Sequence, residues 1–99
     1  MARFGVYANP DGPGYLLDCQ ADVLSDLTTR FVVPLLRPDE APRPSGGLNP
    51  RFRLLGEDVL MMTHFAGAVP ASFLGDAVAS MEHEHSAIMN AFDMLLTGY

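Results

Sequence analysis

The segment from Ser80 to Gly98 limits the fold more than any other feature, because it reads as an amphipathic helix. Its apolar side chains recur at the three- and four-residue spacing of one helical face. Ser80 is the expected N-cap, since its hydroxyl can accept hydrogen bonds from the free amides of the first turn. Gly98 suits the left-handed position that commonly follows a helix. The predicted buried face comprises Met81, His85, Ile88, Phe92, Leu95 and Leu96.

The residues before this helix predict strands separated by turns. Apolar residues alternate with others over 3–8, and residues 9–14 are rich in turn-forming types. A third, β-branched stretch contains Pro34, which cannot donate to a ladder and therefore indicates a sheet edge or a bulge. The predicted strands cover residues 3–8, 15–20, 30–36, 52–55 and 59–65, with a brief further strand over 76–79.

Residues 37–50 form the clearest predicted loop. This segment contains four prolines and two glycines, which disfavour both a helix and a central strand. Loops of this length in compact domains often bind partners or move. We expect residues 66–70 to lead off the fifth strand and residues 70–75 to form a short connection, and we place the turn between the fourth and fifth strands at residues 56–58.

Strands first and one helix last predict an α+β domain, with an antiparallel sheet packed against the helix. A chain of 99 residues fits a single domain spanning residues 1–99. No apolar run is as long as a membrane span, and the N-terminal residues turn polar too soon for a signal peptide. We therefore expect a cytoplasmic protein that does not bind membranes.

The charge is distributed unevenly along the chain. The net charge is −6, lysine is absent, and no basic residue follows Arg53. Because duplex nucleic acid is held mainly by cations against phosphate, the acidic C-terminal half is expected to repel it. A basic protein surface is the better electrostatic partner, although acidic surfaces also favour solubility by themselves.

No set of residues predicts an enzyme. The sequence contains no phosphate-binding glycine loop, nucleophile elbow or paired cysteines. His83 and His85 would point about 200° apart on a helix, so we expect no metal site. The lone Cys19 is expected to be a buried packing residue. We accordingly expect no cofactor and no catalytic residue.

Several short motifs occur in an order that resembles one known family. A Phe-Gly-Val-Tyr strand begins at Phe4, residues 18–24 read Asp-Cys-Gln-Ala-Asp-Val-Leu, and residues 30–35 read Arg-Phe-Val-Val-Pro-Leu. The later matches are Met61-Met62-Thr63, Val69-Pro70, Leu74-Gly75, Ile88, Asn90, Ala91 and residues 95–98. Together they resemble the CcdB family of toxins from plasmid-type toxin–antitoxin pairs, over nearly the whole chain.

The resemblance implies an SH3-like antiparallel β-barrel with a C-terminal helix, assembled as a homodimer without enzymatic activity. It also implies a toxin that inserts at the dimerisation domain of the DNA gyrase A subunit, traps the enzyme on cleaved DNA, and is neutralised by a CcdA-like antitoxin. The gyrase contacts that carry over are Val23, Leu24, Asp93, Thr97, Gly98 and Tyr99. We expect the antitoxin surface at Asn9, Pro10, Asp11, Gly12, Arg43 and Ser45.

The chain departs from the family pattern at its C-terminal end. Thr97 stands where the best-known member has a tryptophan that stacks on a gyrase arginine, an interaction of about 1–2 kcal/mol when desolvated. Tyr99 can offer an aromatic face from another position, and Asp93, in place of an amide, can pair with an arginine. Two alternatives therefore stay open: a non-toxic or retargeted relative, and an endoribonuclease of the MazF or Kid type, which shares the barrel.

Overall fold

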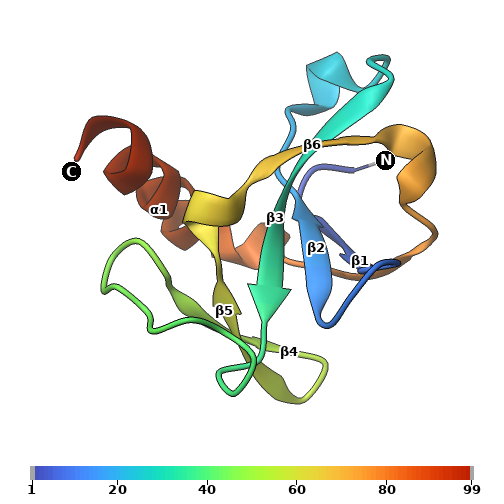
Figure 1. Ribbon diagram of the computed structural model, residues 1–99. Coiled ribbons are helices and arrows are strands. Elements are labelled where there is room, and N and C mark those ends of the chain that lie inside the picture. The colour runs from blue at the N-terminus through green and yellow to red at the C-terminus, as the bar shows by residue number, and fades with distance from the viewer. Residues whose placement is uncertain (1, 99) are drawn as a thin grey trace.

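The computed structural model describes residues 2–98 (Figure 1). Strands make up most of the regular structure, short 3₁₀ turns connect some of them, and an α-helix follows. The strands are β1 (Gly5–Ala8), β2 (Tyr15–Asp18), β3 (Thr29–Leu36), β4 (Arg51–Leu54), β5 (Glu57–Met61), β6 (Gly67–Pro70) and β7 (Ala77–Ser80). The helical elements are η1 (Asp22–Leu24), η2 (Thr63–Phe65), η3 (Ala71–Phe73), η4 (Glu82–Glu84) and α1 (His85–Thr97).

The strands pair antiparallel in the order β4-β5-β3-β2-β1-β7. β6 lies off this path and pairs with the first half of β3. The sheet curls into a half-barrel with α1 at one side of it (Figure 1). This arrangement confirms the predicted α+β class with a C-terminal helix. Among the described helices, none combines the length and the apolar character needed to cross a membrane.

β3 is the strand that joins the sheet together. One of its edges pairs with β2, and the other pairs first with β6 and then with β5. Pro34 lies where this second edge changes partner, because the pairing with β6 reaches only to Val32 and the pairing with β5 starts at Leu35. The Pro34 carbonyl accepts the N–H of Met62 at 2.9 Å, so its nitrogen faces the same gap. The predicted edge or bulge is therefore a gap between two partner strands along a central strand.

The main core lies between the curled sheet and α1. Met81, Ile88 and Phe92 of the predicted helical face are buried there, as their spacing indicated. The prediction is wrong for Leu95 and Leu96, which are 42% and 77% exposed. The last turn of α1 extends beyond the sheet, so it has no sheet surface to pack against (Figure 1). The prediction is also wrong for His85, which is exposed, although its ring touches that of Phe4. The other residues of the main core are Phe4, Val6, Leu17, Cys19, Val33, Leu35, Phe52, Leu54, Val59, Met61 and Ala91.

The helix begins later than predicted. Ser80 ends β7, where it pairs with Gly5, and this pairing keeps its backbone extended instead of making it a helix N-cap. Its hydroxyl accepts the N–H of Glu82 at 3.3 Å, but the segment that follows is the 3₁₀ turn η4. At the other end Gly98 has φ 83° and donates its N–H to Met94, which confirms the predicted left-handed position.

Three strand boundaries also differ from the predictions. Residues 67–70, expected only to lead off the fifth strand, form the separate strand β6. Their short sequence shows no strong alternation, and they become a strand by pairing with β3. Residues 63–65 form η2 instead of extending the fifth strand. Residues 57 and 58 belong to β5, since the hairpin turns at Leu55 and Gly56, both of which have positive φ.

β2 and β3 bury an ion pair inside the sheet. Asp18 and Arg30 are 0% and 1% exposed, and Arg30 donates two hydrogen bonds to Oδ2 of Asp18, from Nε at 2.9 Å and from Nη2 at 2.6 Å. The Oδ1 atom of Asp18 accepts the N–H of Gln20 at 3.0 Å. Burial, and secondarily the Asp18 carboxylate, raise the pKa of nearby Tyr7. Asp18 and Arg30, which belong to the motifs that resemble the family, therefore have a structural role: they link β2 to β3.

Candidate docking surfaces

The turn η1 carries the first pair of predicted gyrase contacts. Val23 and Leu24 are 87% and 48% exposed. The buried side chain of Gln20 fixes this turn, because its Nε2 donates to the Leu24 carbonyl at 2.9 Å and its Oε1 accepts the N–H of Phe31 at 3.0 Å. An anchored backbone that exposes apolar side chains is suited to binding another protein.

The C-terminal end of α1 carries the second group. Asp93 and Thr97 are exposed on the helix, and Gly98 follows it. The Thr97 hydroxyl donates to the Asp93 carbonyl at 2.6 Å, so it is bonded to its own helix. Leu96, which no sequence argument assigned to this surface, is the most exposed large apolar residue of the helix. The predicted contact Tyr99 lies outside the described residues.

The structure does not bring these two groups into one patch. Figure 1 shows η1 and the end of α1 at separate places on the molecule. The N-terminal segment lies between them: the Arg3 N–H donates to Oδ1 of Asp22 at 2.8 Å, and its Nη2 donates to the sulfur of Met89 at 3.4 Å. Arg3 also lies 4.6 Å over the ring of Phe4. No sequence pattern predicted this bridge, because its partners are distant along the chain.

Beside this bridge is a small cleft of about 260 Å³. Its charged residues are Arg3, Asp22 and Glu82, and His85 also contributes to its wall. None of these was predicted as a site residue. The cleft adjoins η1 through Asp22 and the first turn of α1 through His85, whereas the second group of predicted gyrase contacts lies at the other end of that helix.

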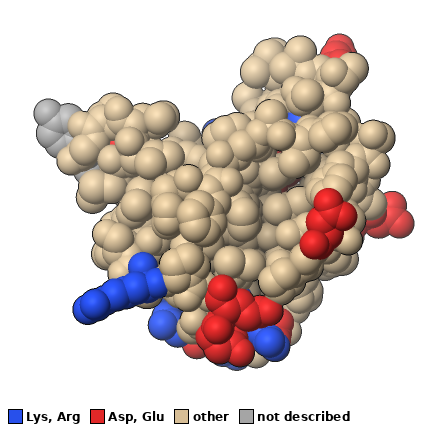
Figure 2. Space-filling model, viewed as in Figure 1, with Lys and Arg blue, Asp and Glu red and all other residues tan. Residues whose placement is uncertain are grey.

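An apolar surface extends along α1. Exposed large apolar side chains come from α1, from β3 and from η2, and ionic side chains gather elsewhere. Figure 2 shows the surface over α1 and β6 almost free of charged residues, with positive and negative groups clustered near the β4–β5 hairpin. The large apolar side chains that are exposed on α1, β3 and η2 are those of Phe31, Phe65, Met94, Leu95 and Leu96, which are 37–77% exposed.

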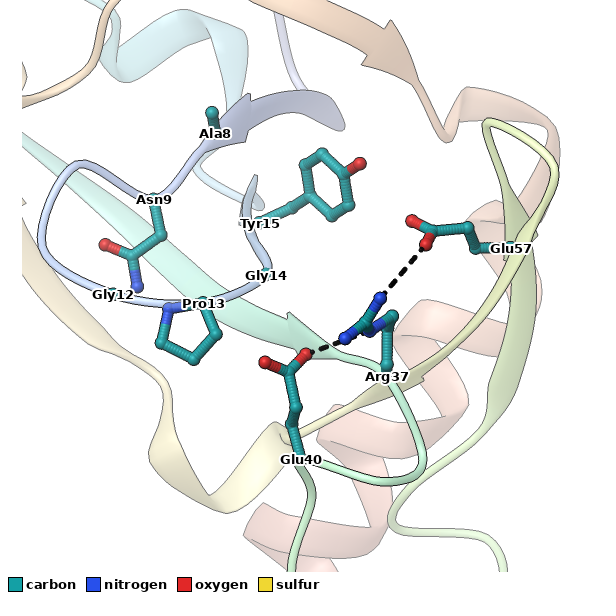
Figure 3. A pocket seen from close by; sticks show the side chains of 9 residues that line it. All are labelled: Ala8, Asn9, Gly12, Pro13, Gly14, Tyr15, Arg37, Glu40 and Glu57. Atoms are coloured by element: carbon teal, nitrogen blue, oxygen red, sulfur yellow. Dashed lines mark hydrogen bonds and ion pairs between the residues drawn. The ribbon is translucent and has the colours of Figure 1, made fainter.

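A second, larger cleft of about 420 Å³ lies on the opposite part of the sheet, beside the β1–β2 turn (Figure 3). Gly14 fixes the shape of that turn. It has φ 80°, and a Cβ there would lie 2.3 Å from the Leu35 carbonyl oxygen, so no other residue fits. The residues that line the cleft are Ala8, Asn9, Gly12, Pro13, Gly14, Tyr15, Arg37, Glu40 and Glu57.

The predicted antitoxin residues fall partly at this cleft. Asn9 and Gly12 line it, and Pro10 and Asp11 are exposed on the same turn, which is held by the Asp11 N–H donating to Oδ1 of Asn9 at 3.0 Å. The exposed Arg43 does not line it.

Ser45, also predicted for this surface, is placed elsewhere. It belongs to a part of the loop that is tied down by Asn49, whose Oδ1 accepts the Ser45 N–H at 2.9 Å and whose Nδ2 donates to the Met61 carbonyl at 3.0 Å. Sequence reasoning missed Arg37, Glu40 and Glu57 at the cleft. The charge run after Arg37 was the available signal, but Glu57 reaches the cleft only through the pairing of the sheet.

Cys19 and His64 are two side chains of commonly reactive types, and they lie in different surroundings. Cys19 is buried in the core, as predicted, and burial raises its thiol pKa to about 12, so the thiol stays protonated. His64 lies against the ring of Phe65, with centroids 4.3 Å apart. Across residues 2–98, no group of three or more His, Cys, Asp or Glu side chains is placed to hold a metal ion.

The fold and these surfaces define a class: a small α+β protein with a curled antiparallel sheet, one C-terminal helix and exposed apolar contact residues. Comparison with protein families adds a specific match. The family model described as CcdB protein matches residues 3–98. The chain therefore belongs to the CcdB family, which identifies it as a toxin of the toxin–antitoxin kind.

Proposed function

We propose that this protein is the toxin of a type II toxin–antitoxin system, which binds the DNA gyrase A subunit and traps gyrase on cleaved DNA. The observation that carries the proposal is the exposed end of α1, where Leu95 and Leu96 face solvent on a helix whose other face is anchored in the core. Burying such a leucine against a partner contributes about 1.5–3 kcal/mol. The proposed action is binding, without catalysis.

The separation of η1 from the end of α1 favours a homodimer. One chain offers two distant groups of predicted contacts. In addition, several large apolar side chains are exposed on or near α1, which is more than the single exposed apolar residues that are common on monomeric proteins. Pairing two copies through Phe31, Phe65 and Met94 would cover part of this surface and leave the helix ends for gyrase. A symmetric dimer of this kind is the commonest assembly of small proteins.

The alternative of an endoribonuclease has less support from the charges. RNA is held by cations that face its phosphates. Arg30 is buried against Asp18, and Arg37 is paired with acidic neighbours. Arg51 and Arg53 share Asp58 at 3.3 and 3.1 Å. Arg30 and Arg37 are therefore neutralised by carboxylates, and Arg51 and Arg53 together carry one net positive charge, so these arginines add little to an RNA-binding face.

The test is expression of the chain in bacterial cells that carry either the normal gyrase A subunit or one altered in its dimerisation domain. Growth arrest is expected only with the normal subunit. Purified gyrase, plasmid DNA and the protein should together yield linearised plasmid, while single-stranded RNA stays intact. Equal arrest in both strains removes gyrase as the target, and specific RNA cuts would establish the endoribonuclease instead. A chain that folds but arrests neither strain is a non-toxic relative.

A further inference from the structure

We infer that Arg3 is a positioning residue, which holds the turn η1 in a fixed place relative to α1 through its contacts with Asp22 and Met89. The inference rests on the function proposed above, because η1 and α1 carry the two groups of predicted gyrase contacts. Arg3 acts through these two elements and does not itself need to touch gyrase.

Arg3 contacts three separate parts of the fold. Its backbone N–H donates to Oδ1 of Asp22, in η1, at 2.8 Å. Its side chain donates from Nε to the Cys19 carbonyl and from Nη2 to the sulfur of Met89, both at 3.4 Å. Because Cys19 directly follows β2 and Met89 lies in α1, one residue joins the turn, the sheet and the helix.

The backbone around Arg3 is strained. Residues 2–5 form a tight turn, which the Gly5 N–H closes by donating to the Ala2 carbonyl at 3.1 Å. Phe4, the third residue of this turn, has φ 65°, a left-handed value that is rare and costly for a bulky side chain. Such strain persists only where the surrounding contacts determine the conformation, and it is concentrated at functional sites. The closing bond of the turn does not use the Arg3 N–H, which is therefore available to Asp22.

Phe4 is held firmly enough to support the strain, and it supports Arg3 in turn. Its side chain is 2% exposed, its N–H donates to the Asp18 carbonyl at 2.6 Å, and its carbonyl accepts the N–H of Met81 at 2.8 Å. The guanidinium carbon of Arg3 lies 4.6 Å from the centre of the Phe4 ring, which is a cation–π contact. The buried ring thus limits where the guanidinium can lie and directs it towards α1.

A fixed η1 lowers the cost of binding a partner. Gln20 holds the end of this turn through the Leu24 carbonyl, and Arg3 holds its first residue, Asp22. With both ends held, the exposed side chains of Val23 and Leu24 keep one orientation relative to α1. A partner that touches both elements then does not have to order them. Loss of the bridge should therefore weaken gyrase binding although no contact with gyrase is removed.

Distances between spin labels test the bridge without gyrase. The labels are attached at Asp26→Cys, just after η1, and at Asn90→Cys, on α1, since both positions are exposed. Cys19→Ala in the same chain prevents labelling of the native thiol. Electron paramagnetic resonance then gives the distribution of label distances, which should be single and narrow in the otherwise unaltered protein.

Four variants decide the outcome of this measurement. R3A removes the contacts to α1 and D22A removes the acceptor in η1, so both should broaden the distribution. D22N keeps an Oδ1 acceptor and should stay narrow. R53A, which removes an exposed arginine far from the bridge, is the control and should also stay narrow. An unchanged distribution in R3A or in D22A overturns the inference.

The second arm measures the affinity for the purified gyrase A subunit by calorimetry. R3A and D22A should each weaken binding about tenfold, the equivalent of one hydrogen bond. Because both act in one bridge, R3A/D22A should bind like either single variant, whereas independent effects would multiply to about a hundredfold. Unchanged affinity of R3A and D22A would show that the inference is wrong, while the proposed function stands. If the unaltered chain does not bind gyrase, the proposed function fails, and the label distances still decide whether Arg3 fixes η1 relative to α1.

Discussion

The guanidinium of Arg30 lies 2.6 Å from the carboxylate of Asp18, with both side chains almost completely buried in the sheet. The pair joins β2 to β3, and Asp18 also holds the backbone of Gln20 at the start of the segment that leads to η1. The pair therefore helps to position the exposed turn η1 from inside the sheet. Because buried charges are stable only when paired, each partner depends on the other.

Replacing Arg30 by methionine should destabilise the protein by about 3–5 kcal/mol, because Asp18 is left buried without a counter-charge. The measurement is the free energy of unfolding in urea. If the single variant does not fold, the double variant D18L/R30M should recover much of the stability, since it removes both charges. R53A, at an exposed pair with Asp58, is the control and should change stability by less than about 1 kcal/mol. Equal effects of R30M and R53A would contradict the structural role of the buried pair.

Leu96→Asp should weaken gyrase binding by about tenfold or more and leave the fold intact. Leu96 is 77% exposed, so the fold loses no buried contact, while a bound partner would lose about 1.5–3 kcal/mol of apolar burial, or roughly tenfold or more in affinity. Pull-down of the purified gyrase A subunit measures the effect. The matched control is Leu55→Asp, at an exposed hairpin position whose positive φ aspartate tolerates. Unchanged capture by Leu96→Asp would place the contact elsewhere.

Thr97→Trp should strengthen gyrase binding by about tenfold, since an aromatic face can stack on a partner arginine where the threonine methyl cannot. The present hydroxyl is bonded to the Asp93 carbonyl of its own helix, so its loss removes no contact to a partner. Calorimetry with the gyrase A subunit measures the change. Thr97→Val, which keeps the shape without the hydroxyl, should bind like the unaltered protein; a Trp variant that binds no better would show that docking here does not use this position.

Gly14→Ala should destabilise the β1–β2 hairpin by more than about 1 kcal/mol, because the new Cβ would clash with the Leu35 carbonyl at an unfavourable positive φ. The thermal unfolding midpoint reports the loss. Gly46→Ala is the control, because a Cβ there meets nothing within 4 Å. A stable Gly14→Ala variant would mean that the turn adopts another conformation.

Stability should fall as the pH rises from about 9 towards 12. Burial, and secondarily Asp18, raise the pKa of Cys19 from 9.0 to about 12, so the unfolded chain releases this proton at a lower pH than the folded chain does. The stabilisation is complete below pH 9.0 and is lost as the pH approaches 12. Tyr7, whose pKa is also raised, acts in the same direction. Urea unfolding across this range measures the slope, which should be smaller in Cys19→Ala; a thiol reagent should label Cys19 at pH 8 only after unfolding.

The sequence predicted those parts of the fold that depend on local patterns. The hairpin between residues 8 and 15, the central strand and the left-handed Gly98 follow from periodicity and from turn chemistry. β6 was missed because its four residues become a strand only through pairing with β3. The end of α1 was misjudged because helical spacing shows which residues share a face, not where the sheet beneath that face ends.

The candidate surfaces likewise combine residues that local sequence or resemblance predicted with residues that only the fold brings together. Val23 and Leu24 were predicted as gyrase contacts from the resemblance alone; both are exposed on a turn, and their role stays a prediction. The grouping of Arg37 and Glu40 with Glu57 was not predictable, because a hairpin brings Glu57 to them from a distant part of the sequence. The spacing of residues along the chain does not predict contacts between segments that are distant in the sequence.

Pro34 has a further consequence for how this sheet avoids misassembly. A register shift of β3 by one residue would place the Pro34 nitrogen, which carries no hydrogen, at a position where the neighbouring strand needs a hydrogen-bond donor. The same shift would turn the side chains of β3 to the opposite face of the sheet. Only the observed alignment matches the missing donor to the interval between β6 and β5. One absent hydrogen atom thus penalises the wrong alignments of the strand on which the rest of the sheet assembles.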